Sequence, residues 1–200
     1  MMYRSEDRAK TESMNQITAQ VRSCTHCELS QTRNKVVMGA GTLDAKIVLV
    51  GEAPGRKEDE SGLPFVGSAG KLLDSLLAAT GLARDDVFIG NIIKCRPPKN
   101  RRPKKSEVAQ CEGYMMEQLK IIKPQVIAPM GNSSLSYFQE RFGLEKQVIG
   151  DVHGRVFEID APWGKNKMFP LYHPAAAIYR RHLLGELEED MKKLGKLVPF

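Results

Sequence analysis

The cysteines are the residues of this sequence whose type and spacing point most directly to chemistry. Cys24 and Cys27 form a C-x-x-C pair, which can place two thiolates on one metal centre, and Cys95 and Cys111 can complete a four-sulfur shell. Two disulfides are disfavoured because nothing in the sequence indicates export, and a set of unrelated buried thiols leaves the C-x-x-C unexplained. We therefore predict a structural metal site. The spacing alone leaves tetrahedral zinc and a 4Fe–4S cluster both open.

Two further segments place polar residues directly after predicted strands. Residues 46–50 (KIVLV) form a short buried strand that leads into GEAPG, and His173 follows the apolar run 167–172. Ligand sites of open α/β sheets lie beyond the carboxyl ends of the strands. At such a place His173 either donates a hydrogen bond to a developing oxyanion or simply begins a helix, and the residue type alone does not decide.

The glycine-rich segment 62–71 contains one aromatic residue, Phe65. Its glycines are similar to a phosphate cradle, but the G-x-x-x-x-G-K-[ST] order of a P-loop is absent, which disfavours a nucleoside triphosphatase. Phe65 lies between a proline and a run of glycines. An aromatic ring in that context either forms an exposed stacking surface or packs into the core.

The basic residues are concentrated in the segment 94–105 (KCRPPKNRRPKK), which contains no acid. The whole chain has 30 Lys and Arg against 24 Asp and Glu, a formal net charge of +6, which favours polyanionic partners without identifying them. Pro97, Pro98 and Pro103 interrupt any helix, so we expect an exposed loop whose cations stay in water. That loop is either simply solvated or a contact for phosphates.

The elements that must position these residues follow from the hydrophobic periodicity. Helices are predicted near 5–22, from 68 to about 80, over 106–122, after Gly131 and over 183–197; strands are predicted at 46–50, 87–93, 125–130, 156–159 and 167–172. Strands and helices alternate through most of the chain. The alternation predicts an α/β fold with a mainly parallel sheet between two layers of helices.

Composition restricts the class of protein further. The chain has 200 residues, of which 42% are hydrophobic and 27% charged, a balance typical of one globular domain over 1–200. Neither a membrane-spanning run nor the apolar centre of a secretory signal is present, so a cytoplasmic protein with no membrane partner is expected. We also expect a monomer.

Taken together, the motifs resemble those of the family 4 uracil-DNA glycosylases, the iron–sulfur branch of their superfamily. The resemblance covers nearly the whole chain, in the family's order and approximate spacing. It is carried by the four cysteines, GEAPG (51–55), GLPFVGSAGKLLD (62–74), IGNIIKCRPPKNRRP (89–103), QVIAPMG (125–131) and YHPAAA (172–177). It implies a three-layer αβα fold with a central four-stranded parallel sheet. It also implies a 4Fe–4S cluster on the four cysteines, and excision of uracil from DNA.

The resemblance also implies roles for residues of a uracil pocket. An enzyme that removes a base must flip the nucleotide out of the stack and read its edge. Phe65 would stack on uracil, and the Asn91 amide can meet both the N3–H and the O4 of uracil, so that cytosine is rejected. His173 would hydrogen-bond O2 of the departing base. Backbone groups of Glu52 and Ala53 would border the pocket and position water.

The catalytic acid or base is the least defined role. Family 1 enzymes of the superfamily have an Asp where Ala53 stands, so the side chain at this position cannot activate water. Glu58 matches the family's acidic residue after GEAPG, and Glu52, within GEAPG, is a second catalytic candidate. Glu58 is expected to orient water, to stabilise an oxocarbenium-like sugar, or to fill the space that a thymine methyl would need.

DNA contacts are expected on two segments. The cations of the basic loop would meet phosphates, and the segment after YHPAAA could carry a wedge that fills the space of the flipped base. The candidates are Lys99, Arg101, Arg102, Ile178, Tyr179, Arg180 and Arg181. The expected substrate is uracil-containing DNA, single- or double-stranded, and the expected product is uracil.

Two rival functions remain. Uracil-DNA crosslinking proteins of the same superfamily carry GEQPG and a nucleophilic histidine in an inserted loop, whereas this chain has Ala53 and no histidine between Asn91 and Cys111. A zinc-bound nucleic-acid module without activity is the other. It leaves Asn91, Phe65 and His173 unexplained.

Overall fold

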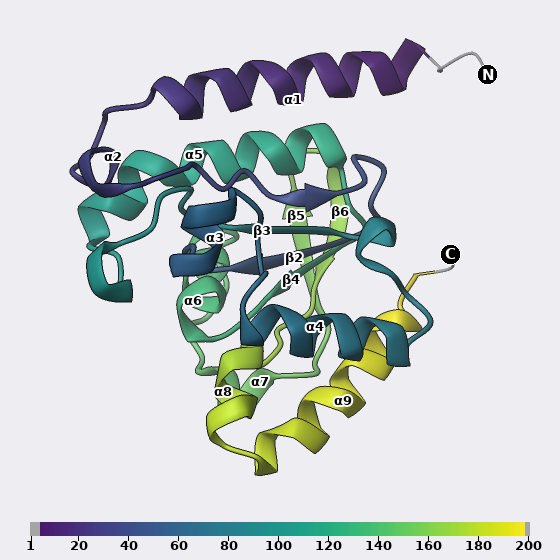
Figure 1. Ribbon diagram of the computed structural model, residues 1–200. Helices are drawn as coiled ribbons and strands as arrows, with labels where there is room; N and C mark the ends of the chain where they lie inside the picture. The colour runs from purple at the N-terminus through teal and green to yellow at the C-terminus, as the bar shows by residue number, and fades with distance from the viewer. Residues whose placement is uncertain (1–4, 199–200) are drawn as a thin grey trace.

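The middle of the sheet is built from three short apolar strands that are buried on both faces. The computed structural model describes residues 5–198, and within them the sheet has six strands in the order β1-β3-β2-β4-β6-β5 (Figure 1). Four neighbouring strands are parallel: β3 (Phe88–Asn91), β2 (Ile47–Gly51), β4 (Val126–Pro129) and β6 (Gly164–Met168). The prediction of an α/β fold with a mainly parallel sheet is therefore confirmed.

Antiparallel edge strands extend the sheet beyond the four strands that the resemblance implies. β1 (Ala40–Gly41) pairs with β3 at one edge, and β5 (Phe157–Ala161) pairs with β6 at the other. β1 has two residues, too few for a periodic pattern to reveal it. The predicted strand 167–172 begins earlier, with β6. Its later residues continue beside β4, where the Phe169 N–H donates to the Ile127 carbonyl oxygen at 2.9 Å.

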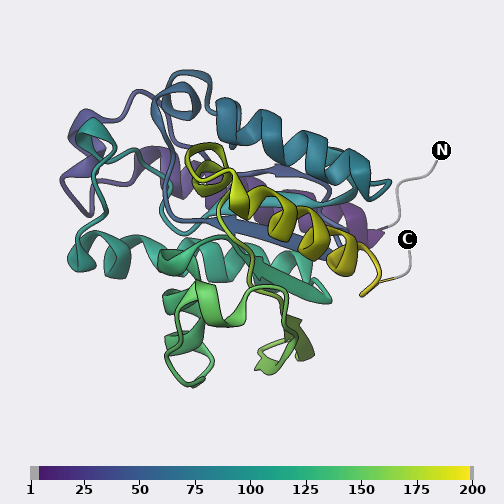
Figure 2. The ribbon, with the colours of Figure 1, turned by 90° about the horizontal axis from the view of Figure 1, so that it is seen from below.

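Helices cover both faces of the sheet. On one face α5 (Lys105–Ile122) and α6 (Asn132–Arg141) pack on the strands, and α1 (Ser5–Ser23) lies outside α5 (Figure 1). On the other face α4 (Ser68–Ala79), α8 (Pro174–Tyr179) and α9 (His182–Gly195) pack together, as the view from below shows (Figure 2). This is the three-layer arrangement, with α1 added outside it.

Two of the helices that cover the sheet, α4 and α5, follow the predicted apolar faces. In α4, Leu73, Leu76 and Leu77 are buried against the sheet, and Gly81 beyond the helix has a φ of +79°, which suits glycine. In α5, Cys111 and Met115 share the buried face. α5 ends before Pro124, as the sequence predicts.

Short elements complete the chain between these layers. They are α2 (Leu29–Thr32), α3 (Arg56–Ser61), α7 (Ile149–Val152) and the 3₁₀ turns at Arg84–Asp86 and Pro98–Asn100. Because β2, β3 and β4 are parallel, their carboxyl ends meet at one edge of the sheet, where GEAPG, Asn91 and Met130 are brought together. No helix within the described residues is long and apolar enough to cross a membrane.

Candidate functional site

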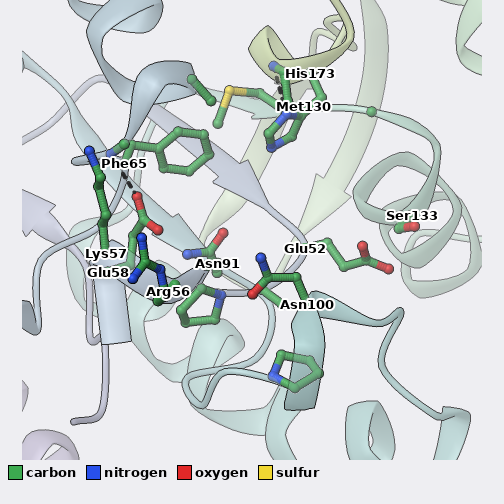
Figure 3. Close-up of a pocket in the computed structure, with 18 of the residues that line it drawn as sticks. Glu52, Arg56, Lys57, Glu58, Phe65, Asn91, Asn100, Met130, Ser133 and His173 are labelled. Atoms are coloured by element: carbon green, nitrogen blue, oxygen red, sulfur yellow. Dashed lines mark hydrogen bonds between the residues drawn. The ribbon is translucent and has the colours of Figure 1, made fainter. Parts of the chain in front are cut away.

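A pocket of about 630 Å³ opens at the carboxyl edge of the parallel strands (Figure 3). Its walls come from the segments that follow β2, β3 and β4, and from the segments that lead into α3, α4 and α8. Its volume lies in the usual range for small-ligand sites. The side chains that matter for its chemistry are Glu52, Ala53, Glu58, Phe65, Asn91, Met130, Ser133 and His173.

Asn91 ends β3, and 2% of its surface is exposed. Its side-chain amide makes no hydrogen bond to any described residue, although it borders the pocket. A buried amide in this state is completed by a ligand or by water. The arrangement depends on Gly51 at the end of β2, because a Cβ there would lie 2.4 Å from Asn91 Oδ1 and 2.9 Å from Phe65 Cζ.

Phe65 enters the pocket from a strained backbone. Its φ is +51°, a left-handed conformation that costs a non-glycine residue about 1–3 kcal/mol. The Arg84 guanidinium holds this turn by donating to the carbonyl oxygens of Phe65 at 2.9 Å and Pro64 at 2.6 Å, while Asp74 accepts from Arg84 at 2.8 Å. Gly70 of α4 permits the close packing, since a Cβ there would lie 1.7 Å from the Phe65 carbonyl oxygen.

The imidazole of His173 faces the Phe65 ring, with ring centroids 5.6 Å apart (Figure 3). His173 caps α8, and its Nδ1 accepts the Ala175 N–H at 3.1 Å. Burial lowers the pKa of His173 to about 4, an effect that the nearby Glu58 carboxylate offsets in part. At neutral pH the ring is therefore uncharged, and because Nδ1 is an acceptor, the proton lies on Nε2.

Glu58 is held on the first turn of α3. Its Oε1 accepts the backbone N–H groups of Val66 at 2.9 Å and Gly67 at 3.0 Å, at the start of α4. The second oxygen, Oε2, faces GEAPG, where a Cβ on Gly55 would lie 2.7 Å from it. One carboxylate oxygen is thus fixed by the protein and the other stays available at the pocket wall.

Among the residues without a role assigned from the sequence are Met130 and Ser133, which line the pocket and follow β4 in the motif QVIAPMG and its continuation. Gly51, which precedes Glu52 and packs against Asn91 and Phe65, is another. Their position after strands of one parallel sheet was the available signal. At the mouth, the exposed Arg102 donates to Ser133 Oγ at 2.7 Å and lies 3.5 Å from Glu52 Oε1, so it joins the ends of β2 and β4.

The four cysteines that were predicted to share a metal site line one separate cavity between α1, α2 and α5. Across residues 5–198, no three His, Cys, Asp or Glu side chains converge closely enough to hold a single metal ion. The Arg33 guanidinium donates to Cys95 Sγ at 3.1 Å and to the Cys24 carbonyl oxygen at 3.0 Å. Burial raises the pKa of the Cys111 thiol to about 11, so a thiolate there needs a compensating positive charge such as a metal.

The basic segment is an irregular loop up to α5, as predicted, but its cations differ in environment. The expectation that they all stay in water is wrong for Lys94, whose exposed fraction is 0%. Arg101 makes a two-point ion pair with the buried Glu107, with N–O distances of 2.8 and 2.6 Å. Lys99 is exposed, has a φ of +55° and makes no ion pair with any described residue.

The end of α8 and the residues that follow it lie outside the pocket. Tyr179 is 87% exposed and Ile178 is 40% exposed, and Arg180 and Arg181 are exposed beside them. The structure therefore brings the uracil-site candidates together and leaves Lys99, Tyr179 and Arg180 on the surface outside the pocket lining.

The fold is an α/β sheet whose pocket combines an aromatic ring, an amide that is unpaired among residues 5–198 and a neutral imidazole, groups suited to a small planar polar ligand. Residues 38–194 match the model of the Uracil DNA glycosylase superfamily, and the chain belongs to that superfamily.

Named relatives match over most of the chain. A type-4 uracil-DNA glycosylase from Archaeoglobus fulgidus is 47% identical over 187 residues, covering 93% of this chain and 94% of the relative. One from Thermotoga maritima is 42% identical over 192 residues, covering 94% and 96%. A type-5 uracil-DNA glycosylase from Pyrobaculum aerophilum is 33% identical over 150 residues, covering 68% and 63%. The resemblance found in the motifs is confirmed.

Proposed function

We propose that this protein is a monofunctional uracil-DNA glycosylase. It flips uracil out of DNA and hydrolyses the N-glycosidic bond, which leaves an abasic site. The observation that carries the proposal is the Asn91 amide, which is buried, unpaired among the described residues and directed at the pocket. An amide offers a donor and an acceptor together, the pattern that matches O4 and N3–H of uracil.

The residues around Asn91 support a consistent set of roles. The Phe65 ring stacks on the flipped base. His173 donates from Nε2–H to O2 of uracil and stabilises the negative charge that develops there as the glycosidic bond breaks. A neutral imidazole is suited to this role, because the hydrogen bond strengthens as the charge grows.

Glu58 and the GEAPG segment are proposed to handle the sugar and the water. Glu58 keeps Oε2 available beside Gly55, so it can orient water or stabilise a cationic sugar. Backbone groups of Glu52 and Ala53 border the same space. A Glu58→Ala variant separates the roles. Uracil turnover falls strongly if Glu58 acts on water, whereas thymine is admitted if it is a steric block.

We propose that Cys24, Cys27, Cys95 and Cys111 hold a 4Fe–4S cluster, which supplies a structural crosslink. The four cysteine side chains border one cavity, as a shared four-thiolate site requires. Measurement of iron, sulfide and zinc in purified protein tests this, and stoichiometric zinc without sulfide would contradict it.

DNA binding is proposed to use the loop 96–102 and the end of α8 with the residues that follow it. Lys99, Arg102 and Arg180 are exposed cations for phosphates, and Tyr179 is the candidate wedge. Arg101 lines the pocket but is paired with Glu107, so we assign it to holding the loop. We propose a monomer, residues 1–200 as one domain, and a cytoplasmic location where the cysteines stay reduced.

The decisive experiment uses an oligonucleotide with one deoxyuridine, followed by alkaline strand scission, with a thymine substrate as control. Wild-type protein should cleave at uracil, and Asn91→Ala should lose most of that activity. A stable protein–DNA adduct under denaturing conditions without base release would instead identify a crosslinking protein. No release and no adduct would refute the proposal and leave a nucleic-acid-binding module.

A further inference from the structure

Lys94 is a fully buried lysine between the base pocket and the cysteine site. Its exposed fraction is 0%, and it follows β3 directly before Cys95. Within residues 5–198 no carboxylate forms an ion pair with it. Burying an amino group at this depth is costly unless its hydrogen bonds are made, so its contacts require an explanation.

The Lys94 side chain bonds to the backbone of Asn91. Its Nζ donates to the Asn91 carbonyl oxygen at 2.7 Å and to Gln118 Oε1 at 2.6 Å, and Met115 Sδ lies 3.6 Å away. The Gln118 amide in turn donates to the Met38 carbonyl oxygen at 2.7 Å. The amine is therefore fixed between the end of β3 and one face of α5.

The backbone of Lys94 is tied to the same helix face. Its N–H donates to Cys111 Sγ at 3.3 Å. Cys111, Met115 and Gln118 recur at helical spacing on α5, so a single residue bridges this face and the strand end. Lys94 thus has one contact to a cysteine of the proposed metal site and another to the residue proposed to read the base.

We propose that Lys94 is a positioning residue for Asn91, and this rests on the proposed function. The Asn91 side chain has no hydrogen bond of its own within the described residues, so its direction depends on the orientation of its backbone. The Lys94 Nζ holds the Asn91 carbonyl oxygen, while the Ile92 N–H of the same peptide unit donates to the Gly51 carbonyl oxygen at 3.0 Å. Recognition of uracil by Asn91 then depends on the Lys94 amine as the side-chain contact that orients this carbonyl.

The test is a double-mutant cycle with Lys94→Met and Asn91→Ala, because Met keeps the length of the side chain and removes the donor. With rates normalised to folded, metal-loaded protein, Lys94→Met should lower kcat/KM for uracil about 10- to 100-fold. The same change in the Asn91→Ala background should cost less than about twofold, since the residue through which it acts is gone. Independent losses in the two backgrounds would overturn the proposal.

Two further variants keep the test decisive. Gln118→Met removes one hydrogen-bond partner of Lys94 Nζ and retains the bond to the Asn91 carbonyl. It should therefore lower kcat/KM less than Lys94→Met does. This variant replaces Lys94→Met in the test if that protein does not fold. Lys120→Met, on the exposed side of α5, is the matched control and should retain wild-type kcat/KM. If wild-type protein excises no uracil, the proposed function fails; if it does and Lys94→Met is unimpaired, the positioning role alone fails.

Discussion

Gly51→Ala isolates the geometry of the base pocket with a single methyl group. The φ of Gly51 lies outside the left-handed region, so alanine can adopt the backbone conformation. Its Cβ would lie 2.4 Å from Asn91 Oδ1, against the 3.4 Å at which ordinary contact begins. Asn91 or the strand must therefore move by about 1 Å, a displacement that in catalytic sites can cost about 100-fold in rate.

The expected result is a loss of about 100-fold in kcat/KM for uracil excision, with the free energy of unfolding lowered by about 1–3 kcal/mol through overpacking. The assay is single-turnover release of uracil from an oligonucleotide, alongside urea unfolding. Gly113→Ala is the matched control, because Gly113 lies at an exposed position of α5 and a Cβ there would meet nothing within 4 Å. Wild-type kcat/KM in Gly51→Ala would show that Asn91 and Phe65 do not contact the base.

Three further predictions concern a titration, a charge and a ligand. Because burial lowers the pKa of His173 to about 4 against about 6.5 unfolded, its contribution to stability is complete above pH 6.5 and falls by up to about 3 kcal/mol as the pH drops to 4. The free energy of unfolding of His173→Gln, measured in urea between pH 7 and 4, should lack this part of the pH dependence. If wild-type and His173→Gln protein differ in unfolding free energy by the same amount at pH 7 and at pH 4, the prediction is wrong. Lys99→Ala should reduce the slope of log K against log salt for DNA binding by about one unit, whereas a parallel slope excludes a phosphate contact. Cys111→Ser should lose bound iron and lower the melting temperature, and full iron retention removes Cys111 from the ligand set.

The sequence was sufficient to predict a residue's location wherever that location follows from its place after a strand or in a short motif. Asn91 and His173 lie where parallel strands end, and the cysteine spacing indicated one shared site. It was insufficient where the partner is distant along the chain. Arg101 looks like a free cation until α5 brings Glu107 beneath it, and Lys94 looks solvated until α5 covers it. Contacts between residues that are distant along the chain produce no local periodic pattern in the sequence, so they could not be predicted from it.

The cysteine site and the base pocket share a second structural connection. Arg33 bonds to Cys95 and to the Cys24 carbonyl, and the next residue, Asn34, donates its backbone N–H to the buried Asp59 at 2.9 Å. Asp59 adjoins Glu58 on α3. The segment that closes the cysteine cavity therefore also anchors the short helix that carries Glu58, and a helix of six residues has little stability without such anchoring. The proposed crosslink on the cysteines would therefore also stabilise the wall of the pocket that carries Glu58.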